Sequence, residues 1–146
     1  MRKFTFRLAA ALMARNARLE LVQAELANVN SRLGLAEELL NSRRTYFEKL
    51  TRGTAERGDI VNPALALQHQ RYLDQVREEI RRRAEIVQQL IAEKDAVQAR
   101  VAEAYRDVRA LETLEEKDRK KWQLEAKREE QKITDDRNGQ RHGRAG

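Results

Sequence analysis

A seven-residue repeat of apolar side chains runs through the first third of the chain. One position of the repeat holds Leu12, Leu19, Leu26, Leu33, Leu40 and Phe47, and the other holds Leu8, Val22, Val29, Ala36 and Leu50. Apolar residues that recur about every 3.5 positions form a single stripe along an α-helix, and two such helices wind around each other. The repeat therefore predicts a helix over about residues 4–51.

The second half of the chain carries the same repeat. Its two positions hold Leu73, Ile80, Val87, Val101 and Val108, and Val76, Leu90, Val97, Ala104 and Leu111. Asn62 followed by Pro63 predicts the start of this helix, because an Asn side chain caps free amide groups and Pro fits the first helical position. We expect the second helix to cover about residues 63–136.

The two repeats are separated by residues 52–62, where Gly53 and Gly58 release the backbone. Helices joined by a short loop pack antiparallel. The expected fold is therefore all-α, a long antiparallel two-helix coiled-coil hairpin in residues 1–138. Residues 139–146 contain several Gly and Arg residues and are expected to form a disordered tail.

The second predicted helix is longer than the first, so part of it is expected to overhang. If the helices pair outward from the loop, Phe4 lies near Leu111, and the next seam positions hold Glu115 and Asp118. The apolar stripe thus fades where its partner ends, which leaves Trp122 on the seam without a partner helix. An earlier start of the first helix or a shifted register would instead make Trp122 cap the hairpin.

Four basic residues interrupt the seam, namely Arg15, Arg43, Arg83 and Lys94. We expect their apolar stems to pack on the seam while the charged ends reach acidic neighbours. The alternative is that they fix the register, or mark places where the seam opens to a partner.

Composition supports a thin helical hairpin and gives no sign of an active site. The chain is 37% charged and 40% apolar, which supplies a two-helix seam but not a compact core. It has no Cys, and His69 and His142 have no second ligand of their kind nearby to complete a metal site. Glu78 and Glu79 point to different faces of a helix in water, so they cannot act as a tuned acid and base. We expect no enzyme, no cofactor and no small-molecule substrate.

Charge also bears on the choice of partner. The net charge is +6, but Asp and Glu lie among nearly every Lys and Arg cluster after residue 19. Such mixing argues against a nucleic-acid binder, whose basic residues gather on one face. The interaction partners are therefore expected to be proteins.

Basic and aromatic residues gather before the first acidic residue, Glu20. They include Arg2, Lys3, Phe4, Phe6 and Arg7. Aromatic anchors surrounded by Arg are typical of the residues that carry most of the binding energy in protein interfaces. The alternative interpretation is an ordinary basic start of a helix.

A second aromatic cluster lies near the predicted loop. Phe47 and Leu73 fall on the seam and are expected to be structural, whereas Tyr46 and Tyr72 flank it. Exposed aromatic side chains on a thin coiled coil favour a docking patch over a purely structural role.

Several of these motifs, in this order, resemble the flagellar export protein FliJ family of bacterial type III export. The run Phe4–Leu8 is close to a K-F-x-F-R-L start, and a Tyr-Leu pair, Tyr72 and Leu73, follows the Gly-containing break. The segment Ala110–Lys117 leads to Arg128–Lys132 and then to an acidic Asp-Asp pair. The resemblance covers about residues 3–136.

The resemblance implies a non-catalytic, cytoplasmic stalk similar in shape to the central stalk of rotary ATPases. Proteins of this family insert the end that carries both termini into the pore of the hexameric flagellar export ATPase and promote its assembly and activity. The residues expected to serve here are Arg2, Lys3, Phe4, Phe6, Arg7 and Trp122.

The resemblance also implies a second contact, with the export gate, a protein of the inner membrane. The matching positions are Tyr46, Leu50, Tyr72 and Val76, and the patch also includes the charged residues Arg43, Glu79 and Arg83. Family members carry export chaperones as well. The implied location is the cytoplasm, peripherally associated with the inner membrane at the export apparatus, in a system that serves motility and chemotaxis.

Two other protein functions fit the same residues. The stalk protein of an injectisome, a virulence-type secretion system, has the same architecture. A generic coiled-coil scaffold or adaptor is the other alternative, and it predicts self-association into longer assemblies without an ATPase partner.

Overall fold

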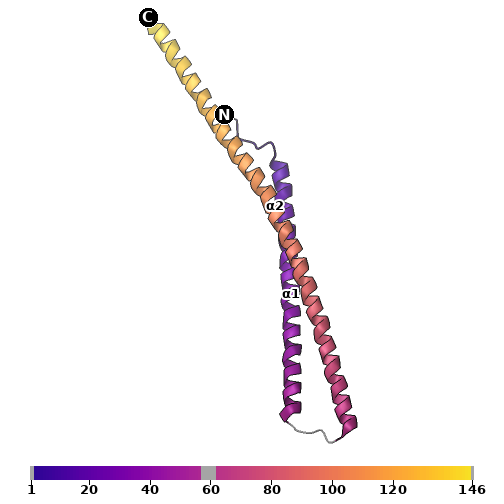
Figure 1. Cartoon of the computed structure of the whole chain (residues 1–146). Coiled ribbons are helices and arrows are strands. Elements are labelled where there is room, and N and C mark those ends of the chain that lie inside the picture. Colours follow the sequence, from indigo (N-terminus) through magenta and orange to yellow (C-terminus); the bar gives the residue numbers. More distant parts are fainter. Residues whose placement is uncertain (1, 57–61, 146) are drawn as a thin grey trace. The chain divides into compact units, whose positions relative to one another are not determined.

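A computed structural model describes residues 2–56 and 62–145, with the side chains of residues 2–53 and 62–143. The chain forms two long helices, α1 (Ala9–Glu56) and α2 (Pro63–Ala145), which Figure 1 colours from indigo to yellow. The segment that joins them, including Gly58, lies outside the described residues. This is the all-α two-helix hairpin that the paired repeats predict.

The helices contribute to two compact units. Residues 1–21 and 102–146 form the terminal unit, and residues 22–101 form the loop unit. Within the terminal unit Arg15 faces Asp107, and within the loop unit Glu25 faces Arg100 and Arg43 faces Glu79. In the loop unit, residue numbers rise on α1 as they fall on α2, so the helices run antiparallel. In the terminal unit, Arg7 pairs with Asp118 and Arg15 with Asp107, which follows the same trend.

The core is the predicted seam. The buried apolar residues are Phe6, Val22, Val29, Leu33, Leu40, Leu73, Val76, Val87, Val97, Ala104 and Val108. All of them except Phe6 occupy positions of the heptad repeat. In the loop unit Leu33, Leu40 and Val87 form one cluster, with Ile80 and Leu90 packed against it. The heptad pattern thus identified the buried side chains of the seam.

Three of the basic seam residues reach acidic partners as expected. Arg43 Nε lies 3.1 Å from Glu79 Oε1, and Arg83 Nη2 lies 3.2 Å from the same oxygen. Arg15 Nη1 lies 3.4 Å from Asp107 Oδ2. Arg43 and Arg83 are half-buried at their seam positions, whereas Arg15 is exposed.

Helix boundaries agree with the sequence signals at one end only. Asn62 Oδ1 accepts a hydrogen bond from the Ala64 amide at 3.0 Å, which is the cap predicted at the start of α2. In contrast, α1 begins at Ala9 rather than near residue 4, because residues 2–8 are not helical. At its other end α1 continues through Gly53, which the sequence pattern assigns to the loop. Likewise α2 continues to Ala145, so residues 139–145 are helical rather than the expected disordered tail. A helical Gly costs only about 1 kcal/mol relative to Ala, so glycines alone do not stop these helices.

Gly34 offers a direct test of the stability of α1. It is exposed in the middle of the helix, and a Cβ atom added there would meet nothing within 4 Å. Gly34→Ala is therefore expected to raise the free energy of unfolding by about 0.5–1 kcal/mol, because Ala loses less backbone entropy in a helix. Urea denaturation followed by circular dichroism measures this change.

Gly139→Ala is the matched control for this substitution. Gly139 is also helical and open to solvent, but it lies where α2 has no buried residue. The control is expected to leave the cooperative unfolding midpoint unchanged. An unchanged or lower midpoint for Gly34→Ala would contradict the prediction.

Candidate functional site

The chain before α1 lies against α2 in the terminal unit. Residues 2–8 are not helical, and in Figure 1 they run from the start of α1 toward the orange part of α2. Phe6 is only 7% exposed, and the Phe4 and Trp122 ring centroids are 6.0 Å apart with the rings tilted by 56°. Phe4 therefore lies opposite Trp122, which corrects the expected register that paired it with Leu111.

Charged side chains reinforce this aromatic contact. The Arg119 guanidinium carbon lies 5.2 Å from the centre of the Phe4 ring, within range of a cation–π interaction. Arg7 Nε lies 3.8 Å from Asp118 Oδ2. Asp118, an acidic residue on the seam, therefore pairs with the basic, non-helical segment before α1 and not with another turn of α1.

The environment of Trp122 also differs from that of an unpartnered overhang. Its side chain is half-buried and contacts Phe4, so the alternative interpretation, in which a shifted register makes Trp122 cap the hairpin, is the one confirmed. The apolar stripe of α2 reaches further than its acidic seam residues suggested. Beyond Glu130 every residue of α2 with a described side chain is exposed.

Trp122 contributes to the lining of three shallow grooves. One is lined by Arg2, Glu125 and Glu129, and a second by Arg7, Asp118 and Lys121. The third lies on α2 alone and is lined mainly by Leu124, Ala126, Lys120 and Lys127. Of the residues predicted to bind the ATPase, Arg2, Phe4 and Arg7 therefore lie around Trp122. Lys3 is exposed and Phe6 is buried in the same segment.

The predicted gate-binding residues lie together in the loop unit. The hydroxyl oxygens of Tyr46 and Tyr72 are 2.6 Å apart, and either hydroxyl can donate the hydrogen bond. The two side chains are 37% and 40% exposed, so a partner can reach both. Leu50 is half-buried, whereas Val76 is 4% exposed and belongs to the seam. The accessible part of this patch is thus the tyrosine pair.

Charges frame the tyrosine pair. The Arg43 guanidinium carbon lies 5.7 Å from the centre of the Tyr46 ring, and Arg43 also pairs with Glu79. Arg77 lies 5.3 Å from the centre of the Phe47 ring in the same way. Basic side chains of both helices therefore contact the aromatic rings of this cluster.

The hydrogen bond with Tyr46 raises the pKa of Tyr72 above the ordinary tyrosine value, helped by partial burial. A raised pKa means that folding favours the protonated form. The resulting stabilisation is fully present below the unfolded pKa and is lost as the pH rises through the folded pKa.

Tyr46→Phe is therefore expected to lower the pKa of Tyr72 toward the ordinary value. Nuclear magnetic resonance of ring-labelled tyrosine, recorded across an alkaline titration, measures it. Tyr105→Phe removes the third tyrosine, which lies in the terminal unit, and is expected to leave the titration of Tyr72 unchanged. An unaltered Tyr72 titration in Tyr46→Phe would show that the hydroxyl contact is not maintained in solution.

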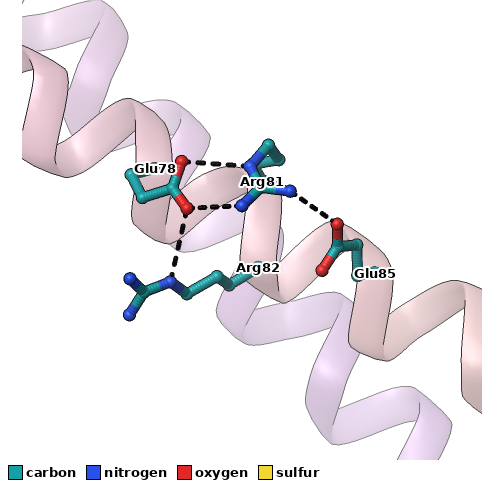
Figure 2. A network of polar contacts seen from close by, with 4 residues as sticks. All are labelled: Glu78, Arg81, Arg82 and Glu85. Carbon is teal, nitrogen blue, oxygen red and sulfur yellow. Dashed lines mark hydrogen bonds and ion pairs between the residues drawn. The ribbon is translucent and has the colours of Figure 1, made fainter.

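A network of four charged residues lies at the surface of α2 in the loop unit. Figure 2 shows Arg81 between Glu78 and Glu85, with Arg82 also reaching Glu78. Arg81 Nη1 is 2.7 Å from Glu85 Oε1, and Arg82 Nε is 3.5 Å from Glu78 Oε1. Residues three and four apart on a helix are neighbours, so these pairs stiffen α2.

This network shifts the pKa values of Glu78 and Arg81. The hydrogen bond from Arg81 lowers the pKa of Glu78, and Glu78 in turn raises the pKa of Arg81. The contribution of Glu78 to stability is thus present above its unfolded pKa and is lost as the pH falls through the folded pKa. Glu79 points instead to Arg43 and Arg83, as expected for adjacent residues on different faces. Sequence analysis missed the network, although the Glu-x-x-Arg spacing of Glu78 and Arg81 signals it.

In residues 2–56 and 62–145, no group of three His, Cys, Asp or Glu side chains is placed to hold a metal ion. Over the same ranges, neither helix contains an apolar stretch long enough to cross a membrane.

Comparison with known proteins connects these surfaces to a family. The family model described as "Flagellar FliJ protein" matches residues 4–146. No curated protein and no solved structure matches the chain. The family match includes both helices, the segment around Phe4 and Phe6, and both aromatic clusters. This two-helix coiled coil therefore belongs to the flagellar FliJ protein family and is a component of the flagellar export apparatus.

Proposed function

We propose that this protein is a stalk that inserts its terminal unit into the pore of the hexameric flagellar export ATPase and promotes assembly and activity of the hexamer. The observation that carries the proposal is the cluster around Trp122, where aromatic and basic side chains of two segments meet. Trp and Arg are the residues most enriched among those that dominate binding energy in interfaces.

The dimensions and charges of the terminal unit suit such a pore. A two-helix coiled coil is only about 20 Å across, narrow enough to enter a ring of subunits. Arg2, Lys3 and Arg7 are exposed on one short segment, and their charge would complement an acidic lining. Complementary charges speed docking and set its orientation more than they raise affinity.

The tyrosine pair supports a second contact, with the export gate in the inner membrane. Tyr46 and Tyr72 come from different helices, are exposed and are held by a mutual hydrogen bond. A rigid, amphipathic aromatic pair loses little conformational entropy on binding. In this role the protein is non-catalytic, lies in the cytoplasm at the inner membrane, and links the ATPase to the gate and to the export chaperones it carries.

The first experiment measures ATP hydrolysis by the flagellar export ATPase of the same organism, with and without this protein. Stimulation of hydrolysis, together with co-elution in a complex the size of the ring, supports the stalk role. If neither occurs, the stalk role is wrong. Self-association without an ATPase complex would instead favour a coiled-coil scaffold, and stimulation of an injectisome ATPase alone would assign the chain to that system.

A double variant, Tyr46→Ala with Tyr72→Ala, separates the two contacts. It changes only the loop unit, so it is expected to stimulate the ATPase as the wild type does while losing binding to the cytoplasmic part of the gate protein. Retained gate binding would remove the tyrosine pair from that interface.

A further inference from the structure

Residues 2–8, here called the strap, are attached to α2 by side chains. The backbone hydrogen bonds of the strap within the described chain run to the first turn of α1, where Phe6 O accepts from Ala9 N and Leu8 O accepts from Leu12 N. Its contacts with α2 include the Phe4–Trp122 ring pair, the Arg119 guanidinium over Phe4, and the long Arg7–Asp118 ion pair. Phe6 of the strap is also 7% exposed, so displacing the strap includes uncovering this side chain. Segments held in this way open at far lower cost than a helix or a strand.

The strap covers the one large aromatic side chain of α2 in the terminal unit that is not exposed. Tyr105 is 53% exposed, whereas Trp122 is half-buried with the Phe4 ring against it. Lifting the strap would uncover the indole and release Phe4, and it would leave Arg7 and Asp118 without each other. A partner surface could then bind the two uncovered aromatic rings through an apolar groove and Arg7 through a carboxylate.

We propose that the strap is a displaceable cover, closed over Trp122 in the free protein and displaced when the terminal unit binds a partner surface that combines carboxylates with an apolar groove. The identity of that partner as the export ATPase rests on the function proposed above. A partner carboxylate can replace Asp118 beside Arg7. The ion pair within the chain is then exchanged for an ion pair between Arg7 and the partner. Arg2 and Lys3 are exposed and form no ion pair within the described residues, so both can gain pairs with the partner.

This arrangement reduces the exposed apolar surface of the terminal unit before it binds a partner. A bare tryptophan with Phe4 and Leu124 nearby would form an adhesive patch on a free coiled coil. With the strap closed, the indole shares its surface with Phe4, and the outward face of the strap is basic and soluble.

The sequence makes a clean measurement possible, because the chain has one Trp and no Cys. Thr5 is exposed, lies within the strap and is not among the residues assigned to the ATPase contact. A Thr5→Cys variant labelled with bimane places a dye whose emission is quenched by nearby tryptophan. The same labelled variant carrying Trp122→Phe gives the unquenched reference.

The free protein is expected to show quenched bimane emission relative to that reference. Arg119→Ala removes a group that holds Phe4 without altering the strap or Trp122, and it is expected to cause partial loss of quenching. Arg109→Ala is the matched control, since Arg109 lies on α2 in the same unit and pairs with Glu112 instead. Equal emission with and without Trp122 would overturn the closed state.

Addition of the export ATPase in excess is expected to abolish the quenching, bringing emission to the Trp122→Phe reference. If the ATPase co-elutes and quenching persists, the strap is a fixed part of the hairpin and the displacement proposal is wrong, while the stalk function stands. If the ATPase neither co-elutes nor is stimulated, the stalk function fails and partner-driven displacement fails with it.

Discussion

Alanine at Leu40 is expected to lower the free energy of unfolding by about 2–5 kcal/mol, the usual range for truncating a buried leucine. Leu40 is 6% exposed and belongs to the cluster with Leu33 and Val87 in the loop unit. A two-helix seam has no second layer that can collapse into the space left by the side chain. Urea denaturation at fixed protein concentration, followed by circular dichroism, measures the loss.

The adjacent residue provides a control that the chain itself supplies. Leu39 directly precedes Leu40 in α1 and has the same side chain, but it is 43% exposed and is not part of the cluster. Leu39→Ala is expected to change the free energy of unfolding by less than about 1 kcal/mol, as surface substitutions usually do. Equal effects of the two substitutions would show that the seam does not follow the heptad repeat.

That pair of residues also shows why the seam could be predicted from the sequence. Heptad spacing is a local property: each apolar residue is placed on one face of its own helix by the fixed rotation per residue. Helical rotation alone places Leu40 on the seam and Leu39 off it, independently of contacts with the rest of the chain. The cap at Asn62 was predictable for the same reason, because its hydrogen bond spans only two residues.

The register was harder to predict, because it depends on contacts between distant residues. Counting outward from the loop paired Phe4 with Leu111, but the structure pairs Phe4 with Trp122 and Arg7 with Asp118. One cause is that α1 continues through Gly53 to Glu56. A helix that runs further toward the loop shifts the pairing along the seam.

The strap could not be predicted from the repeat at all. Phe6 is buried without occupying a heptad position, because residues 2–8 leave the helix and pack by a different geometry. Composition still pointed to the right residues, since aromatic and basic side chains before Glu20 suggested a binding surface. Which α2 residues they meet is fixed by tertiary packing.

The tyrosine pair could be predicted in part from the sequence. Helical spacing placed Tyr46 and Tyr72 beside the seam on their own helices, and the cluster near the loop was expected. The hydrogen bond between their hydroxyls, and the charged frame of Arg43 and Glu79, required the two helices to be set against each other. Whether a gate protein uses this surface stays a prediction.

Charge reversal of the strap is expected to have the largest effect on function. The triple variant Arg2→Glu, Lys3→Glu and Arg7→Glu should reduce hydrolysis by the export ATPase to the rate of the ATPase alone. The reversed charges repel an acidic partner surface, which lowers stimulation. The carboxylate introduced at position 7 would also repel Asp118 and so favour the displaced strap, which means that a loss of stimulation comes from the first effect. Hydrolysis is measured over a range of stalk concentrations at low and at physiological salt.

The matched control reverses three exposed basic residues of the loop unit, Arg44→Glu, Lys49→Glu and Arg52→Glu. Each triple variant changes the net charge from +6 to 0, so the two differ only in where the change lies. The control is expected to keep full stimulation. Comparable loss in both variants would mean that net charge, rather than the strap, governs the interaction.

A charge-swap variant separates the two effects within the strap. Arg7→Glu combined with Asp118→Arg restores an ion pair between the strap and α2 but reverses its direction. If binding requires positive charge on the strap, this variant closes over Trp122 and still stimulates less than the wild type. If Arg7 serves only to position the strap, stimulation returns, and the contact with the ATPase must then come from Arg2, Lys3 and the aromatic residues.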